Sequence, residues 1–417
     1  MSVTDNFSTQ TVNLMIGKSW NNIKEEDIKR LVDDAVPESH TLDYKEELPN
    51  ESAKSELDFL CDVASFANAS GGELIFGIKE KREEGRPTAI PEAFVQLRMR
   101  GTLDETKRRL ESLIRSGITP TIAVKISHFD NLPAGPVIVV RVPASWAAPH
   151  MVTRYGKDFL KPQFYQRHNG GNHPMDIGEI RAAFTVSESR FVRVRQFRTE
   201  RLDIIQADEA LVDGPQPRRA IHLLPINLFD PNTSLDISRL ENRTWGQSPA
   251  FIGNPRWRSS YFNFEGYLIQ DFAPKNESKP FAYVQIFHAG AIESIKIVSD
   301  YQHIGNDFEV NTIRQVKDLA KILVDLEVSP PILIMLSLLR LKNAHLMLPP
   351  NTQYSGPQND LNRELLPLPE CILEDWDTPI ENVLRPAFNA LYQSAGMPRS
   401  FNHDKDGNWN GQEIAFH

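Results

Sequence analysis

The first third of the chain places apolar residues at helical and then at strand spacing. Between Ser55 and Asn68 the apolar side chains recur three or four positions apart, which predicts an amphipathic helix that packs on a sheet. The glycines at 71 and 72 predict a tight turn after this helix, because glycine adopts positive φ without a Cβ clash. Leu74 to Ile78 is predicted to be a buried strand, in which Gly77 lets another backbone or a ligand approach closely. The alternative is that the glycines only make a tight connection.

The pattern in the second half predicts a run of strands followed by helices. Strands are predicted over Ala220–Ile226, Tyr261–Phe264, Phe281–Phe287 and Ala291–Ile297, the last two joined as a hairpin by the turn at His288-Ala289-Gly290. Helices are predicted over Val310–Leu326, Pro331–Leu341 and Pro379–Ala395. Strands first and helices afterwards indicate an α+β domain.

Motifs in the first half resemble a known family. Leu42-Asp43-Tyr44-Lys45-Glu46 is followed by Phe66-Ala67-Asn68, the two glycines and the apolar strand, and later by Val137–Pro143, Pro149-His150 and Tyr165-Gln166-Arg167. This ordered set resembles the Alba-like domain of the Schlafen family and extends over residues 25–185. The resemblance implies an α+β fold class: an N-terminal arm over 1–24, a Schlafen Alba-like α/β domain over 25–185, and a C-terminal α+β recognition or assembly domain over 186–417. Asn263-Phe264-Glu265-Gly266 and the segment Phe287 to Glu293 resemble the C-terminal region often attached to bacterial Schlafen-like chains.

Composition excludes several classes of protein. The 417 residues are 40% hydrophobic and 24% charged, as in ordinary soluble globular proteins. Met1 to Gln10 lacks the pattern of a signal peptide, and no run reaches the ~18 apolar residues of a membrane span. We therefore expect a cytoplasmic protein without a membrane partner. Cys61 and Cys371 are too few for a disulfide framework or a structural zinc site.

The net charge of −9 requires that any nucleic-acid contact come from a local basic surface. One candidate surface includes Arg108 and Arg109, on a helix predicted over Leu103–Ser116. A second follows the first domain, where arginines alternate with aromatic and apolar residues, a pattern that suits a phosphate backbone and stacked bases. Its candidate binding residues are Arg190, Arg193, Arg195 and Arg198. The alternative is a solvated helix face together with an Arg-rich surface strand that pairs with nearby carboxylates.

The residues that could carry out catalysis lie near the start of the first domain, in and just before the segment Leu42–Glu46. Asp43 and Lys45 are two positions apart, so on a strand they share a face. An acid directed to Mg²⁺ or Mn²⁺ beside a lysine directed to the scissile phosphate is typical of metal-dependent nucleases, and oxygen ligands suit these cations.

The resemblance implies a trio of metal-binding acids, which fall here on Glu38, Asp43 and Glu80. Lys79 stands where an acid is common in the family, so either Glu80 supplies the third carboxylate or the trio is incomplete. The resemblance also makes Arg167, in the family's Tyr-x-Arg-x-Gly loop, a candidate phosphate contact. The alternative is that these acids form a surface ion-pair cluster with Lys45, Lys79 and Lys81.

A nucleotide-binding site of the Walker type is rejected. Gly17-Lys18-Ser19 lacks the leading glycine, because Val12 stands at that position, and no apolar strand precedes it.

These observations lead to three hypotheses of function. The first is a Schlafen-like metal-dependent endoribonuclease that acts on structured RNA such as tRNA, and the resemblance implies a role in antiviral defence. The second is a non-catalytic regulator that binds RNA or DNA. The third is a protein-interaction subunit of a larger assembly, with a protein partner or self-assembly through the C-terminal domain. The hypotheses are separated by whether Glu38, Asp43 and Glu80 converge in the fold within reach of a common metal ion.

Overall fold

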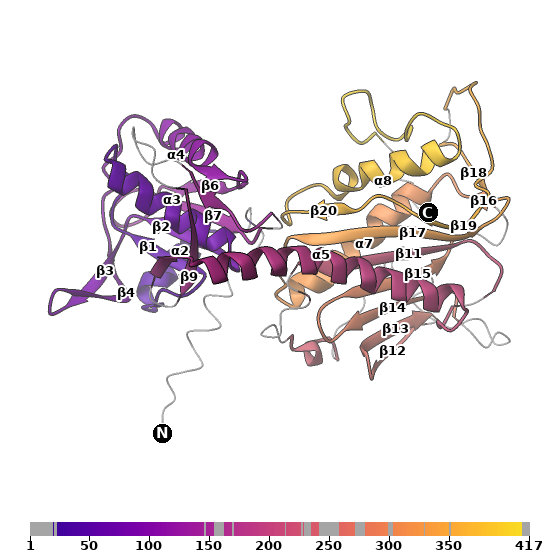
Figure 1. Ribbon diagram of the computed structural model, residues 1–417, viewed down its shortest axis with the longest axis horizontal. Helices are drawn as coiled ribbons and strands as arrows, with labels where there is room; N and C mark the ends of the chain where they lie inside the picture. The colour runs from indigo at the N-terminus through magenta and orange to yellow at the C-terminus, as the bar shows by residue number, and fades with distance from the viewer. Residues whose placement is uncertain are drawn as a thin grey trace. The chain divides into compact units, whose positions relative to one another are not determined.

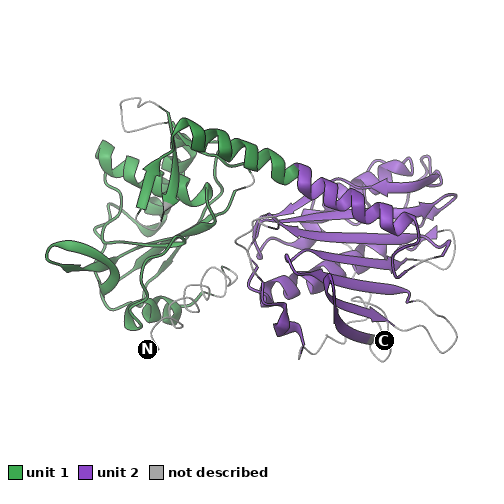
Figure 2. Ribbon diagram, turned by 60° about the horizontal axis from the view of Figure 1, so that its bottom comes forward, with its two compact units in different colours: residues 1–191 green, residues 192–417 purple. Residues whose placement is uncertain are grey.

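The chain folds into two compact units. A computed structural model describes residues 20, 23–145, 147–153, 162–168, 171–212, 214–226, 228, 235–241, 258–271, 280–298, 303–328, 330–349 and 352–410. Unit 1 comprises residues 1–191 and unit 2 comprises residues 192–417 (Figure 2). The boundary expected at 185/186 falls inside the helix α5 (Ile177–Gln206). Most of the predicted arm over 1–24 lies outside the described residues.

Unit 1 is built around a four-stranded mixed sheet in the order β1-β2-β7-β6 (Figure 1). Strand β1 runs parallel to β2, and the other pairs are antiparallel. A second sheet has the order β10-β9-β8-β5, and β3 and β4 form a separate hairpin. The elements are α2 (Glu25–Asp33), β1 (Leu42–Lys45), α3 (Ala53–Ala67), β2 (Gly71–Phe76), β3 (Ile78–Glu83), β4 (Arg86–Phe94), α4 (Leu103–Gly117), β5 (Ile118–Thr119), β6 (Lys125–Phe129), β7 (Val137–Pro143), β8 (Met151–Val152), β9 (Gln163–His168) and β10 (Gly171–Pro174).

The main sheet of unit 1 is buried on both faces. Leu74 and Phe76 of β2 pack with residues of α3 and α4, whereas Ile75 between them packs with residues of α2. Successive side chains of a strand point to opposite faces, so an uninterrupted apolar strand fills two cores. The helices predicted over 55–68 and 103–116 and the strand predicted over 137–143 are confirmed.

The turn between α3 and β2 does more than connect them. Gly71 has φ of +77°, and a Cβ there would lie 2.6 Å from the Ala144 nitrogen. The Asn68 side chain donates to the carbonyl oxygens of His150 and Tyr165, at 2.9 Å each, and accepts from the His150 N–H at 2.6 Å. Asn68 therefore joins β9 and the residue before β8 to the end of α3, and Gly71 lets the chain pass close to the backbone at the end of β7.

Unit 2 contains one antiparallel sheet of eight strands. Seven follow the order β12-β13-β14-β15-β11-β17-β19, and β20 also pairs with β17. The elements after α5 are β11 (Arg218–Pro225), η2 (Ile237–Leu240), β12 (Arg258–Asn263), β13 (Gly266–Asp271), β14 (Ala282–Phe287), β15 (Ile292–Ile297), β16 (His303–Ile304), α7 (Phe308–Asp325), β17 (Ile332–Leu341), β18 (His345–Leu346), β19 (Arg363–Pro367), β20 (Cys371–Leu373) and α8 (Ile380–Ser394). The predicted hairpin is confirmed as β14–β15.

The helix predicted over Pro331–Leu341 is wrong, because this segment forms the strand β17. It lies inside the sheet, where it pairs with β11 on one side and with β19 and β20 on the other. A strand that is buried on both faces shows no alternation of apolar and polar residues, so its apolar run resembles that of a buried helix.

The two faces of this sheet are covered differently. On one face, α7 and α8 enclose the largest core of the molecule, which includes Ile221 and Leu336. On the other, Leu202 and Ile205 of α5 pack with Ala220. The Arg-rich segment is therefore part of a helix that packs on the sheet, and the alternative of a surface strand is wrong. In the part of the chain that the structure describes, no helix is long and apolar enough to cross a membrane.

Candidate active site

The sequence-predicted acids and their lysine line one cavity of unit 1. Its volume is about 780 Å³, and its walls come from β1, α3, the β3–β4 hairpin, β9 and β10. The predicted residues on its lining are Glu38, Asp43, Lys45, Glu80 and Arg167. The fold thus brings together residues that are up to 129 positions apart in the chain.

Strand β1 presents Asp43 and Lys45 on one face, as predicted. Leu42 and Tyr44 alternate with them and are buried in the core beneath α2. The Lys45 Nζ lies 3.1 Å from Asp43 Oδ1. The pleat of a short edge strand is therefore what aims an acid and a base together into the cavity.

Glu38 is partly buried beside two other acids, Asp43 and Glu80. Its carboxylate accepts the Tyr44 N–H at 2.7 Å, and its own N–H donates to the Ala89 carbonyl oxygen at 2.7 Å. Burial, followed by interactions with Asp43 and Glu80, raises the pKa of Glu38 to about 9. The groups that shift this pKa include no cation, so Glu38 holds a proton at neutral pH.

Asp43, by contrast, remains ionised although it is buried. Burial acts to raise the pKa of Asp43, but Lys45, Arg167 and a hydrogen bond with Glu38 together hold it below its usual value. The Arg167 Nη1 donates to Asp43 Oδ2 at 2.8 Å. The carboxylate of Asp43 therefore interacts with a lysine, an arginine and a protonated acid at the same time.

Arg167 is held in place from behind. Its guanidinium lies over the Phe66 ring, 4.4 Å from the centroid, and its side chain is 5% exposed. A Cβ on Gly72 would collide with the same ring, so the second glycine of the motif leaves room for the aromatic platform. The guanidinium of Arg167 is hydrogen-bonded to Asp43. Its contact with a phosphate stays a prediction.

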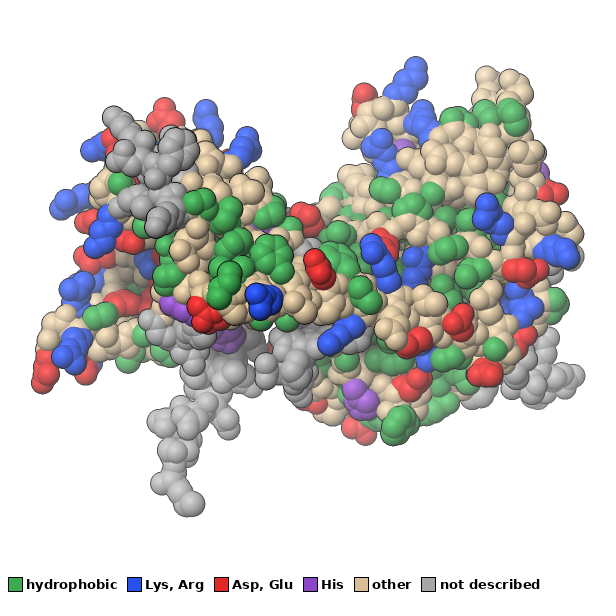
Figure 3. All heavy atoms as spheres, viewed as in Figure 1, with side chains coloured by type: hydrophobic (Ala, Val, Ile, Leu, Met, Phe, Trp, Pro, Cys, Tyr) green, Lys and Arg blue, Asp and Glu red, His purple; other side chains and the backbone are tan. Residues whose placement is uncertain are grey.

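A bulge in the β3–β4 hairpin selects Glu80 as the third acid. The register shifts between Lys79 and Glu80 and again between Glu80 and Arg82. Lys79 instead pairs with Glu92 of β4, its Nζ 2.9 Å from Oε2. Since a bulge re-aims a side chain, the carboxyl of Glu80 reaches the cavity and hydrogen-bonds with Glu38. The rest of the hairpin carries acidic and basic side chains intermixed (Figure 3).

Asp62 of α3 also lines the cavity, although the sequence pattern did not single it out. Its Oδ2 lies 3.0 Å from Lys45 Nζ, and its Oδ1 accepts the Asn172 side-chain N–H. Burial and then the nearby Asp43 outweigh the effect of Lys45 and raise the pKa of Asp62 to about 6. The available signal was an acid between Cys61 and Val63 on the apolar side of the predicted helix.

The donor set suits a hard cation, but the side chains are not arranged around one. Among the described residues, no three His, Cys, Asp or Glu side chains form a ready metal site. Glu38, Asp43 and Glu80 meet as a hydrogen-bonded cluster, while Lys45 and Arg167 take up the oxygens of Asp43. Carboxylate oxygens are the ligands that Mg²⁺ and Mn²⁺ prefer, and a protonated acid that faces other acids is a position that a cation would ionise. The residues therefore fit a divalent cation in chemistry, although Asp43 would have to release one of its present partners.

The predicted arginine surfaces have different outcomes. On α4, Arg108 is exposed, whereas Arg109 donates to the Pro49 carbonyl oxygen. On α5, Arg193 is exposed, Arg190 is half-buried, and Arg195 makes two hydrogen bonds to Glu370, at 2.9 and 3.0 Å.

The prediction that Arg198 binds nucleic acid is corrected by its burial. Its side chain donates to Ser337 Oγ at 2.8 Å and to the Leu336 carbonyl oxygen at 2.8 Å, and the residue is 8% exposed. The guanidinium thus anchors α5 on β17. It is not available to a phosphate, because the sheet already satisfies it.

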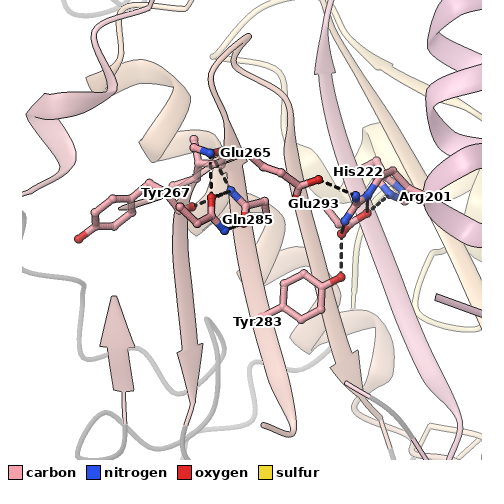
Figure 4. Close-up of polar contacts among 10 residues, drawn as sticks. Arg201, His222, Glu265, Tyr267, Tyr283, Gln285 and Glu293 are labelled. Carbon is pink, nitrogen blue, oxygen red and sulfur yellow. Dashed lines mark hydrogen bonds and ion pairs between the residues drawn. The ribbon is translucent and has the colours of Figure 1, made fainter. Parts of the chain in front are cut away.

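Arg201 anchors the same helix through a buried cluster in unit 2 (Figure 4). Its Nε and Nη2 donate to the two oxygens of Glu293, at 2.8 and 2.7 Å. The Tyr283 hydroxyl donates to Glu293 Oε1 at 2.7 Å, and His222 Nε2 lies 3.0 Å from Oε2. Burial would raise the pKa of Glu293, but Arg201 and His222 lower it to about 2.

Comparison with known families places the cavity in a defined domain. Residues 38–176 match the family model described as Schlafen, AlbA_2. These residues form a Schlafen AlbA_2 domain. This domain contains the cavity residues Glu38, Asp43, Lys45, Glu80, Arg167 and Asn172. The Schlafen AlbA_2 domain indicates a nucleic-acid-related function, with a nucleic acid as partner.

The chain is also similar to a domain of known structure. The N-terminal domain of a RecG-related protein from Nitrosomonas europaea, solved by NMR, is 23% identical over 35% of this chain and 91% of that chain, with a TM-score of 0.25. No curated protein matches the chain in sequence.

Proposed function

We propose that the Schlafen AlbA_2 domain is a metal-dependent endoribonuclease that cuts structured RNA such as tRNA. The observation that carries the proposal is the excess of acid on a cavity that also holds the aligned Asp43 and Lys45. Six carboxylic acids and three basic side chains line it. The acids are Glu38, Asp43, Glu46, Asp58, Asp62 and Glu80, and the bases are Lys45, Arg82 and Arg167.

A polyanionic substrate would be repelled by this lining as it stands. Like charges that meet in a poorly solvated cavity cost several kcal/mol. Protonation of Glu38 removes only part of the excess. A divalent cation would neutralise the rest, so the charge balance supports a requirement for Mg²⁺ or Mn²⁺, held by Glu38, Asp43 and Glu80.

The residues of the chain take distinct parts in the proposed reaction. Mg²⁺ or Mn²⁺, when bound, supplies Lewis-acid stabilisation of a phosphate and activation of water. Lys45 presents its ammonium to the scissile phosphate, and its side chain is 34% exposed, so a substrate can reach it. Arg167 supports the position of Asp43 through their hydrogen bond. A role as an effector of antiviral defence belongs to the same proposal and rests on the family resemblance alone.

The test is a cleavage assay on a panel of tRNAs and hairpin RNAs, with Mg²⁺, with Mn²⁺ and with a chelator. We expect cleavage only with metal. Asp43→Asn keeps the shape of the side chain and removes its charge, so the rate should fall by roughly a hundredfold or more while circular dichroism stays unchanged.

Asp104→Asn on the exposed first turn of α4 is the matched control for the charge change and should cleave like the wild type. If wild type and Asp43→Asn cleave equally, or if neither cleaves with any divalent ion while both bind RNA, the domain is a binding regulator and not a nuclease. DNA hairpins in the same assay decide between RNA and DNA as the substrate.

A further inference from the structure

Lys45 is held by two carboxylates, although one would balance its charge. Its Nζ lies 3.1 Å from Asp43 Oδ1 and 3.0 Å from Asp62 Oδ2. The two acids come from different elements, Asp43 from the edge strand β1 and Asp62 from the helix α3. Desolvation of a second carboxylate is costly, so its presence beside the same ammonium calls for a reason other than neutrality.

Asp62 is fixed more firmly than its contact with Lys45 requires. Its second oxygen accepts from Asn172 on β10, and the Asn172 oxygen in turn accepts the Ser65 hydroxyl at 2.5 Å. Its side chain is 8% exposed. The carboxylate therefore has one orientation, set by a strand and by its own helix.

Asp43 has the opposite character, because its oxygens are shared among Lys45, Arg167 and the protonated Glu38. Any cation that Asp43 binds in the proposed function competes with Lys45 for the same oxygens. A lysine held by Asp43 alone would lose its position at the moment when it is needed. Asp62 faces Lys45 from the other side and takes no part in that competition.

We propose that Asp62 is a positioning residue that keeps the ammonium of Lys45 aimed into the cavity when Asp43 is engaged by a metal ion. This inference rests on the proposed function for its catalytic consequence, but not for the contact itself. Asn172 and Ser65 are the supports of Asp62, and Lys45 is the group through which it acts.

The first arm of the test does not depend on RNA cleavage. In competitive acetylation at pH 8, the reactivity of Lys45 is compared with that of the exposed Lys54 in the same molecule by mass spectrometry. Burial would lower the pKa of Lys45, but Asp62 and Asp43 raise it. Loss of an opposite charge at this distance typically changes a lysine's pKa by about one unit or more, so Asp62→Asn should increase the relative labelling of Lys45 about tenfold or more. An unchanged ratio overturns the proposal.

The second arm uses cleavage and separates positioning from metal binding. Asp62→Asn should lower kcat by roughly 10- to 100-fold, as the loss of a residue that supports an active-site group does, and leave KM for RNA and the Mn²⁺ requirement unchanged. A rate within twofold of the wild type overturns the proposal, and so does a matching loss of Mn²⁺ affinity, which would make Asp62 a metal ligand. Glu56→Gln, on the same helix but away from the cavity lining, is the control.

Asn172→Ala replaces Asp62→Asn if the latter does not fold. It keeps both charges and removes the hold on Asp62, so both readouts should move in the same direction by a smaller factor. If wild type shows no cleavage at all, the proposed function fails while the labelling arm still decides whether Asp62 holds Lys45.

Discussion

The two units each contain a cluster of buried acids and bases, and the clusters differ in how completely they are satisfied. Around Glu293 in unit 2, both carboxylate oxygens have donors from Arg201, Tyr283 and His222, and the pKa of Glu293 is lowered to about 2. Around Glu38 in unit 1, burial and two further acids raise the pKa to about 9. In the first, closed cluster the donors around Glu293 satisfy both of its oxygens, whereas in the second, open cluster Glu38 faces a cavity, and no basic side chain is among the groups that shift its pKa.

This difference separates a structural cluster from a functional candidate. A carboxylate that is fully paired stabilises the fold and offers nothing to a ligand, while perturbed acids in a cavity store unfavourable energy that a ligand can release. The same distinction applies to the arginines, since Arg198 is satisfied inside unit 2 and Arg193 is exposed to solvent.

The largest effect is expected in the closed cluster. Glu293→Gln leaves the Arg201 guanidinium, whose side chain is 13% exposed, without its buried counter-charge, which costs about 3 to 5 kcal/mol of stability. Glu265→Gln removes the other carboxylate of the same arginine, 3.0 Å away and 43% exposed, and should cost less than about 1 kcal/mol. Urea denaturation measures both. Equal losses of unfolding free energy in the two variants would mean that burial does not determine how much each ion pair of Arg201 contributes to stability.

The open cluster should behave in the opposite way, with an effect of intermediate size. The pKa of Glu38 is raised from an ordinary 4.5 to about 9, so its contribution to stability is present below pH 4.5 and is lost as the pH rises towards 9. Glu38→Gln should therefore be more stable than the wild type at pH 8, by about 1 to 2 kcal/mol after allowance for solvent screening, and no more stable at pH 4.

Urea midpoints at the two pH values measure this difference, and addition of Mn²⁺ should narrow it by stabilising the wild type. The Glu293 cluster has the reverse dependence: because its pKa is lowered from 4.5, its contribution is present above pH 4.5 and is lost as the pH falls towards 2. A Glu38→Gln variant that is less stable than the wild type at pH 8 would refute the claim that the Glu38 carboxyl destabilises the fold at this pH.

The smallest effect concerns the exposed part of α5. If Arg193 contacts a phosphate, Arg193→Ala should weaken RNA binding to a similar extent for all sequences and reduce the slope of log K against log salt by about one. Arg363→Ala, at an exposed arginine of β19, is the control. A salt slope that is the same in both variants removes Arg193 from the interface.

The sequence predicted the local geometry of the site well. The alternation at Leu42 to Lys45 correctly placed Asp43 and Lys45 on one face, and the helix before Asn68 was confirmed. These features depend on neighbours in the chain and on backbone rules that hold in any fold. The strand after this helix was predicted over Leu74 to Ile78, but it begins at Gly71, includes both glycines and ends at Phe76. Glu80 was expected as a third carboxylate, and the structure places it on the cavity lining through a bulge that the sequence did not reveal.

What the sequence did not reveal depends on contacts between distant segments. Asp62 meets Lys45 and Asn172 only after α3, β1 and β10 are assembled, so helical periodicity alone left it as one acid among apolar residues. Arg198 was assigned to a surface because its partners lie on β17 and in the segment before β20. The strand β17 was taken for a helix because its long apolar run has no period, and its pairing decides its conformation.

Calorimetric titration of the protein with Mn²⁺ at several pH values shows directly whether the acids of the cavity bind a metal ion. We expect one site, whose affinity rises up to tenfold per pH unit between about pH 6 and pH 9 as the metal displaces the proton of Glu38, and whose binding is lost in Asp43→Asn. Glu293→Gln, if folded, should bind Mn²⁺ like the wild type, because its acid belongs to the closed cluster. No binding by the wild type, or equal binding by Asp43→Asn, would contradict the account.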